Sequence, residues 1–434
     1  MTSTLTKPSD LTPLNAPTFR RLPNGLTIIA EHLPVDAVNL SVWLNVGSAV
    51  ESDEINGMAH FLEHMIFKGT PQLAAGEFES VIEGRGAVTN AATSQDYTHY
   101  YITCAPQDFA LLAPLQIDVL LNASIPDEAF ERERLVVIEE IRRAEDNARR
   151  RTYQRSMETA FEVLPYKRPV LGPVSVIEQL TPQQMRDFHR SKYQPQSMTA
   201  VAVGNLPVDE LIAIVTEAFA GALANTDSQD VKPETDYLNL KAESAFTETV
   251  RREYVDGSLQ QARLVMMWRV PGLADLSETY ALDVLATILG HGRTTRLVQD
   301  LREDRGLVSS ISVSNMTQRL QGVFYISAQL MEENLVVVEE AIARHIRTIQ
   351  TELVTEAEMA RVRTQVANRF IFGNETPSDR ANLYGYYQSI VGDLAPALNY
   401  PAYIQAIDAT DVQQAARKYL SPDACGVVIL RPEK

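Results

Sequence analysis

Two histidines and a glutamate with the spacing H-x-x-E-H form the first candidate site of this chain. The stretch HFLEHMIFKGT occupies residues 60–70 and places Glu63 between His60 and His64. In a helix, residues four apart lie on one face, so both imidazoles would point the same way. The surrounding residues are mostly apolar, which predicts a buried helix. Burying these groups is costly unless they are paired or bind a metal. A pair of structural histidines is the alternative, and the pattern favours a metal site.

A zinc ion bound by two histidines needs a third protein ligand and an open position for water. The segment DEAFERERLVVIEEIRRAED, residues 127–146, predicts a second helix. Glu133 and Glu140 share one face of this helix at about 3.6 residues per turn. Glu139 lies on another face, where Arg143 one turn later can pair with it. Glu140 has no such partner in its helix, so we expect it to be the third ligand.

Glu133 lies two turns before Glu140 on the same predicted helix face. A carboxylate at that place can accept a hydrogen bond from the second nitrogen of a ligand imidazole and so orient the ring. We therefore expect Glu133 to support one of the two histidines from behind.

The order of predicted elements repeats along the chain. Residues 181–204 predict a helix, a Lys-Tyr pair, a turn and an apolar strand, and residues 410–430 follow the same order. Residues 40–70 and 262–297 each predict a strand, a loop and a helix. Strands and helices are mixed without strict alternation, which favours an α+β fold over a doubly wound one. We expect two tandem homologous halves, each a largely antiparallel sheet with helices packed on it.

A polar segment separates the two halves. Residues 222–249 contain few large apolar side chains and show no clear periodicity, which is typical of a linker. The predicted domains are therefore residues 18–221, which carry the zinc site, and residues 250–434, with the linker between them.

Composition excludes several classes of function. The chain has 434 residues and a formal net charge of −17, without a basic patch, so nucleic acid is not an expected partner. No apolar run approaches the roughly 18–20 residues that span a membrane, so we expect no membrane insertion. Two distant cysteines, Cys104 and Cys425, and the absence of a signal-peptide pattern predict a cytoplasmic protein. The acidity makes basic peptides plausible ligands.

The segments GMAHFLEHMIFKGT (57–70) and ERLVVIEEI (133–141) together resemble the M16 metallopeptidases, whose H-x-x-E-H motif defines inverzincins. These enzymes include pitrilysin, insulin-degrading enzyme and the mitochondrial processing peptidase. NAATSQDYTHYY (90–101) and LGHGRTTRLVQDLREDRGL (289–307) resemble further segments of short, two-unit (M16B-like) members, although the family is often richer in glycine near residues 291–296. The resemblance covers the chain from about residue 18. It implies the LuxS/MPP-like metallohydrolase fold and one Zn²⁺ per chain.

The resemblance also implies an oligomer and a second set of site residues. Family members form a clamshell chamber from four related units, so a chain with two units implies a homodimer, or a heterodimer with a related subunit. An Arg and a Tyr seven residues apart contact substrate across the chamber. Arg380 and Tyr387 match this spacing, with Tyr384 and Tyr386 as competing choices.

The function implied is that of a zinc-dependent endopeptidase acting on extended, unfolded peptides. We expect His60, His64 and Glu140 to bind the metal, a zinc-activated water to attack, and Glu63 to act as general base. Arg380 and Tyr387 would hold the substrate carbonyl or the developing oxyanion. Substrate would pair as a strand with residues 87–94, where Asn90 is a candidate contact.

The alternative is a non-catalytic scaffold subunit of a processing peptidase or a respiratory complex. Relatives of that kind have lost the metal residues, all of which are present here. A non-peptidase zinc hydrolase is a third possibility, which a panel of unstructured peptides would test.

Overall fold

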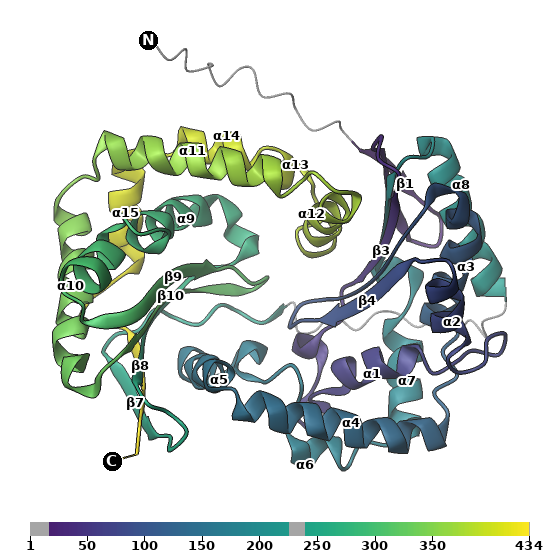
Figure 1. Cartoon of the computed structure of the whole chain (residues 1–434), viewed down its shortest axis with the longest axis horizontal. Helices are drawn as coiled ribbons and strands as arrows, with labels where there is room; N and C mark the ends of the chain where they lie inside the picture. The colour runs from purple at the N-terminus through teal and green to yellow at the C-terminus, as the bar shows by residue number, and fades with distance from the viewer. Residues whose placement is uncertain (1–16, 225–238, 434) are drawn as a thin grey trace, which may run out of the picture.

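The computed structural model describes residues 17–224 and 239–433 and contains two separate β-sheets. The expected α+β fold with two similar halves is confirmed, because each half contributes one largely antiparallel sheet covered by helices (Figure 1). The strands of the first sheet, in spatial order, are β1 (Thr18–Arg21), β2 (Thr27–His32), β6 (Met198–Gly204), β3 (Val38–Leu44), β5 (Thr98–Cys104) and β4 (Val88–Thr93). Those of the second are β7 (Val250–Val255), β11 (Gly426–Arg431), β8 (Ala262–Pro271), β10 (Gln321–Leu330) and β9 (Val308–Met316).

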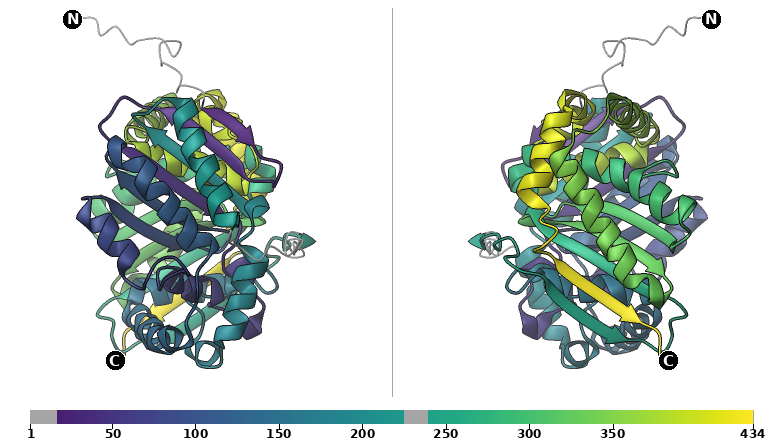
Figure 2. Two further views of the ribbon diagram at one scale, coloured as in Figure 1. Left: turned by 90° about the vertical axis from the view of Figure 1, so that its right-hand side faces the viewer. Right: turned by 90° about the vertical axis from the view of Figure 1, so that its left-hand side faces the viewer.

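The two sheets share one topology, apart from the additional edge strand β1. The order β2-β6-β3-β5-β4 in the first sheet corresponds to β7-β11-β8-β10-β9 in the second. Each sheet has one parallel pair at the matching place, β2 with β6 and β7 with β11, and its other pairs are antiparallel. Figure 2 shows β11, in yellow, lying beside β7 in the second sheet. The order of elements therefore repeats, as the sequence predicts.

Helices occupy matching places in the two halves. The first half contains α1 (Met58–Ile66), α2 (Glu77–Gly84), α3 (Phe109–Leu121), α4 (Asp127–Asp146), α5 (Ala148–Ala160), α6 (Val174–Ile177), α7 (Pro182–Lys192) and α8 (Val208–Ala224). The second contains α9 (Leu276–Gly290), a π-helix (Val298–Asp304), α10 (Leu335–Thr351), α11 (Glu356–Phe372), α12 (Pro377–Ile390), α13 (Ala395–Leu398), α14 (Tyr400–Ala406) and α15 (Ala409–Tyr419). Within these described ranges, no helix is both long and apolar enough to cross a bilayer.

Each half also lends one helix to the sheet of the other half. Helix α12, from the second half, packs on β3 and β6, and helix α5, from the first half, packs on β11 and β8. Strand β3 is buried along its whole length because helices cover both of its faces. Gly385 allows the close approach of α12, since a Cβ there would lie 2.0 Å from Nε1 of Trp43. This exchange was not predicted from the sequence.

The predicted linker lies largely outside the described residues. Residues 222–224 form the last turn of α8, and residues 225–238 are not described. Beyond them, Glu243 lies on the first half, where its carboxylate accepts hydrogen bonds from the backbone of residues 162–164, and it also pairs with Arg269 at 2.9 Å. The domain boundaries stay a prediction.

Candidate metal centre

Helix α1 carries the H-x-x-E-H motif and is buried on nearly all sides. Its apolar side chains belong to the core of the first half, and six of them are fully buried: Met58, Ala59, Phe61, Leu62, Met65 and Ile66. The helix begins after Gly57, whose φ of +99° places it in the left-handed region that favours glycine. A buried helix between the sheet and α4 holds its polar side chains in fixed positions.

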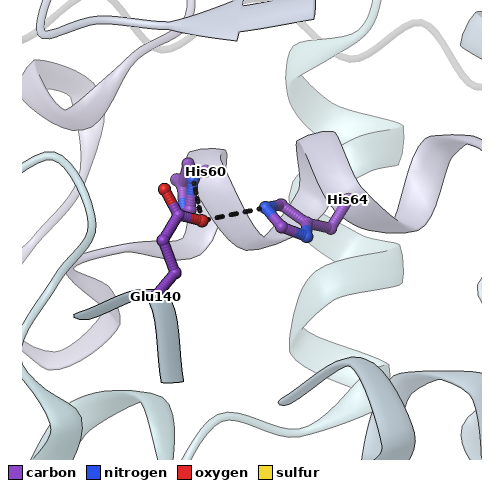
Figure 3. A group of neighbouring side chains, drawn as sticks. All are labelled: His60, His64 and Glu140. Carbon is purple, nitrogen blue, oxygen red and sulfur yellow. Dashed lines mark ion pairs between the residues drawn. The ribbon is translucent and has the colours of Figure 1, made fainter. Parts of the chain in front are cut away.

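His60, His64 and Glu140 converge on one point, as Figure 3 shows. Oε2 of Glu140 lies 3.4 Å from Nε2 of His60 and 3.4 Å from Nε2 of His64. Ligand atoms about 2.0–2.2 Å from a tetrahedral zinc are separated by roughly 3.4 Å, so these spacings fit a shared zinc ion. Among the described residues, this is the only group of three or more histidine, cysteine or acidic side chains close enough to bind one metal.

Glu139 takes no part in this group. Its carboxylate points to solvent and pairs with Arg143, with Oε1 3.2 Å from Nε. Glu140, one residue later, reaches the two histidines across the contact between α4 and α1. The two neighbouring glutamates therefore lie in different environments, as their helix faces predict.

The two histidines differ in their support. Nδ1 of His64 lies 3.0 Å from Oε1 of Glu133, and Oε2 of Glu133 lies 2.8 Å from Nζ of Lys68. Nδ1 of His60 is buried and has no hydrogen-bond partner within the described part of the chain. The ring of His64 is thus oriented by a carboxylate, whereas that of His60 relies on its packing and on the helix backbone.

The ionisation of the group suits metal binding, because a metal requires neutral imidazole and ionised carboxylate ligands. Burial, with a contribution from the neighbouring His64, lowers the pKa of His60 to about 4. The hydrogen bond from His64 holds the pKa of Glu140 below its ordinary value, against the opposing effect of burial. Burial acts in the opposite direction on His64, whose pKa is raised overall by its two carboxylate neighbours.

Glu63 lies beside the group without joining it. Its Oε2 accepts a short hydrogen bond from the hydroxyl of Thr93, the last residue of β4. Burial raises the pKa of Glu63, and the Thr93 hydrogen bond opposes that rise. A buried carboxylate with a raised pKa is a stronger base than an exposed one, which suits proton transfer. Sequence reasoning did not identify Thr93 or Lys68, because both act through contacts between separate elements.

Glu51 is a further residue that sequence reasoning missed. It is 4% exposed and lies before α1, where its carboxylate accepts hydrogen bonds from the backbone N–H groups of Gly57 at 2.8 Å and Ala59 at 2.7 Å. Nδ2 of Asn56 donates to the same carboxylate at 2.9 Å. Burial raises the pKa of Glu51 to about 7. A glycine N-cap signals that the helix needs such an acceptor, but several acidic residues nearby qualify.

Arg380 and the tyrosines of α12 lie away from the metal group of their own chain. The guanidinium of Arg380 makes a short ion pair with Glu31, which is 2% exposed, and the hydroxyl of Tyr384 lies 2.7 Å from the same carboxylate. Tyr387 is half-buried, and Tyr386 contacts its ring. Arg380 and Tyr384 thus attach α12 to the first sheet, while contact with substrate by Arg380 and Tyr387 stays a prediction.

Asn90 lies on β4, at the edge of the first sheet. It is exposed, and its Oδ1 accepts a hydrogen bond from the N–H of Ala91 at 2.9 Å. It pairs in register with Tyr101, whereas Thr93 pairs with Thr98, so the side chains of Asn90 and Thr93 point to opposite faces of the sheet. Asn90 is therefore on the same strand as the Glu63 contact but not on the metal side.

Comparison with known families places both halves in one group. Residues 27–174 match the family described as Insulinase (Peptidase family M16), and residues 179–366 match the Peptidase M16 inactive domain. The first match contains His60, Glu63, His64 and Glu140, and the second contains none of them.

Individual relatives align over most of the chain. An uncharacterized zinc protease of Mycobacterium bovis is 30% identical over 98% of this chain and 95% of its own length. A probable mitochondrial-processing peptidase subunit beta of Arabidopsis thaliana is 28% identical over 94% of this chain and 77% of its own length. The crystal structure of a protease from Helicobacter pylori superposes with a TM-score of 0.88 and 25% identity, covering 97% of this chain and 100% of that chain.

Proposed function

The chain belongs to peptidase family M16, the insulinase family, and from this premise we propose that it is a zinc-dependent endopeptidase. The observation that carries the proposal is the convergence of His60, His64 and Glu140, with Glu63 beside them. His60, His64 and Glu140 would hold one zinc ion per chain. When bound, zinc would polarise the scissile carbonyl and make a water molecule acidic enough to react near neutral pH.

The chain's own groups supply the proton transfers. Glu63 accepts the proton of the attacking water as the water oxygen bonds to the carbonyl carbon. The same carboxyl then gives that proton to the amide nitrogen as the C–N bond breaks. Thr93 holds one oxygen of Glu63, which limits the carboxylate to one orientation. These roles require Glu63 to remain outside the metal ligand set, as its position allows.

The edge strand β4 supports the choice of extended peptides as substrates. β4 ends its sheet, so one side of its backbone is available for pairing with an added strand. Thr93, on this strand, contacts Glu63, so a peptide paired with β4 would lie close to the general base. Backbone pairing favours unfolded chains and reads little sequence. Asn90 is the proposed side-chain contact, and the net charge of −17 favours basic peptides.

We further propose that the chain acts as a homodimer in the cytoplasm. In that assembly Arg380 and Tyr387 would approach the metal centre of the partner. The ion pair between Arg380 and Glu31 gives this arginine a structural role within one chain as well. A heterodimer with a related subunit is the alternative arrangement.

The scaffold alternative is less well supported. The match to the inactive domain covers residues 179–366, which lie after all four residues of the metal centre. The second half would therefore be the non-catalytic unit, and the first half the catalytic one. A scaffold subunit has no reason to keep a spacing suited to zinc together with a buried base.

A peptide panel tests the proposal. Zinc-loaded protein is incubated with unstructured peptides of basic, neutral and acidic sequence, with a stably folded protein and with a small ester. We expect cleavage of the peptides, fastest for the basic ones, and none of the folded protein. Cleavage of the ester alone would contradict the peptidase proposal.

A further inference from the structure

The N-terminal end of the metal-bearing helix is held by a buried carboxylate that the proposed mechanism does not use. Helix α1 has Gly57 as its N-cap, and this residue provides no side-chain acceptor for the first N–H groups of the helix. Unpaired N–H groups in a buried helix end are costly. Glu51 accepts two of them, from Gly57 and Ala59, and a third hydrogen bond from Asn56 fixes its position.

The carboxylate of Glu51 is itself anchored from behind. Arg168 donates to the backbone oxygens of Glu51, at 2.6 Å, and of Ser48, at 3.3 Å. The guanidinium of Arg168 also pairs with Asp53 at 3.0 Å. The loop before α1 is therefore fixed at its backbone as well as at the Glu51 side chain. A loop fixed in this way can set the position of the first helical turn.

His60 is the residue most exposed to the consequences. It directly follows Ala59, whose N–H lies 2.7 Å from Oε1 of Glu51. Unlike His64, which Glu133 orients, His60 has no hydrogen bond to Nδ1 within the described residues. The direction of its ring toward Glu140 thus depends on the backbone of the first turn. A small rotation of that turn would move His60 and leave His64 held by Glu133.

We propose that Glu51 is a positioning residue of the metal centre, which sets the first turn of α1 and through it directs His60 toward the metal. The inference rests on the proposed function, because it assigns Glu51 a role toward the zinc ligands. Glu51 touches neither substrate nor metal, so its effect passes through the helix backbone.

The test is a zinc titration against a competing chromogenic chelator, with wild type, Glu51→Gln and Thr355→Ala. Glu51→Gln keeps the size of the side chain but replaces one acceptor oxygen by a donor. Thr355→Ala removes the side-chain cap of α11, far from the metal centre, and is the control for a general loss of stability. We expect Glu51→Gln to weaken zinc binding about 10- to 100-fold, as for other residues that orient ligands. Thr355→Ala should bind zinc like wild type.

The outcomes separate the two proposals. A wild type that binds no zinc would overturn the proposed function. A wild type and a Glu51→Gln variant with equal zinc affinity would overturn only the role of Glu51. With zinc saturating, we expect Glu51→Gln to lower kcat while KM changes less than twofold, a split that simple destabilisation would not produce.

Hydrogen exchange of the wild-type protein provides a readout that does not depend on a folded variant. The amides of Gly57 and Ala59 should exchange as slowly as those in the middle of α1, because Glu51 holds them. Exchange at the rate of an exposed loop would show that the capping contact does not persist in solution, and would contradict the inference.

Discussion

Glu133 connects two residues of the first half, because one of its oxygens lies 3.0 Å from Nδ1 of His64 and the other lies 2.8 Å from Nζ of Lys68. Lys68 and His64 together hold the pKa of Glu133 below its ordinary value, although burial acts against them. The carboxylate therefore stays ionised and accepts the hydrogen bond that fixes the His64 ring. Such partners commonly determine how tightly a ligand histidine holds its metal.

Replacing Glu133 should weaken the metal site without removing it. Glu133→Gln keeps the shape of the side chain but loses the charge that holds His64, so we expect zinc affinity to fall about 10- to 100-fold. Glu128→Gln, on the exposed start of the same helix, is the control. Competition with a chelator measures both variants. If Glu133→Gln and Glu128→Gln bind zinc equally well, Glu133 does not support His64 as described.

The hydrogen bond from Thr93 to Glu63 should contribute to the rate of the chemical step. Thr93→Val keeps the β-branched shape and removes the hydroxyl, so Glu63 loses the contact that fixes its orientation. We expect kcat to fall about tenfold, equivalent to roughly 1.4 kcal/mol, with KM little changed. Thr89→Val, on the same strand and the same face, should leave kcat at the wild-type value. Equal kcat values for the two variants would exclude this role of Thr93.

The contact of Arg380 with Glu31 predicts a stability effect that a purely substrate-binding arginine would not show. Arg380→Gln leaves the buried Glu31 without its cation, which should lower the free energy of unfolding by about 3–5 kcal/mol. The double variant Glu31→Gln/Arg380→Gln should recover part of that loss. Denaturant unfolding measures the three proteins. An Arg380→Gln protein as stable as wild type, with reduced peptide cleavage, would instead support the role in substrate contact alone.

An ion pair in the second half predicts how stability depends on acidity. Hydrogen bonds from the Arg296 guanidinium lower the pKa of Glu358 to about 2, and burial partly opposes this. Because the folded-state pKa is lowered, the pair stabilises the protein above pH 4.5 or so, and this stabilisation is lost as the pH falls toward about 2. Solvent screening leaves about 1–2 kcal/mol of this effect.

Glu358→Gln tests this dependence. The unfolding free energy of the variant should lie below that of wild type at pH 6, and the difference should shrink as the pH falls below about 4. Glu356→Gln, whose carboxylate on the same helix is largely exposed, serves as the control. A difference that stays constant from pH 6 to pH 3 would contradict the assignment.

The features that follow from short-range spacing could be predicted from the sequence. His60, Glu63 and His64 lie in one helical segment, and the separate faces of Glu139 and Glu140 follow from the helical repeat. The two homologous halves follow from repeated element order, and the strand order of the sheets confirms them.

The features that depend on packing between distant segments could not be predicted in this way. Nothing in residues 148–160 or 377–390 indicates that each helix would cover the sheet of the other half. Thr93 and Lys68 contact Glu63 and Glu133 only because separate elements meet. Arg380 illustrates the limit of resemblance, because its spacing to Tyr387 matches a family pattern while its ion pair with Glu31 becomes visible only in the fold.

The central claim is that Glu140, together with His60 and His64, holds a catalytic zinc ion. The most direct measurement is the zinc content and peptide cleavage of wild type, Glu140→Gln, Glu139→Gln and Glu63→Gln, purified in parallel and dialysed against the same low concentration of zinc. The account predicts about one zinc per chain and cleavage for wild type and Glu139→Gln, zinc without cleavage for Glu63→Gln, and loss of both for Glu140→Gln. Retention of zinc and cleavage by Glu140→Gln, or a wild type without either, would contradict it.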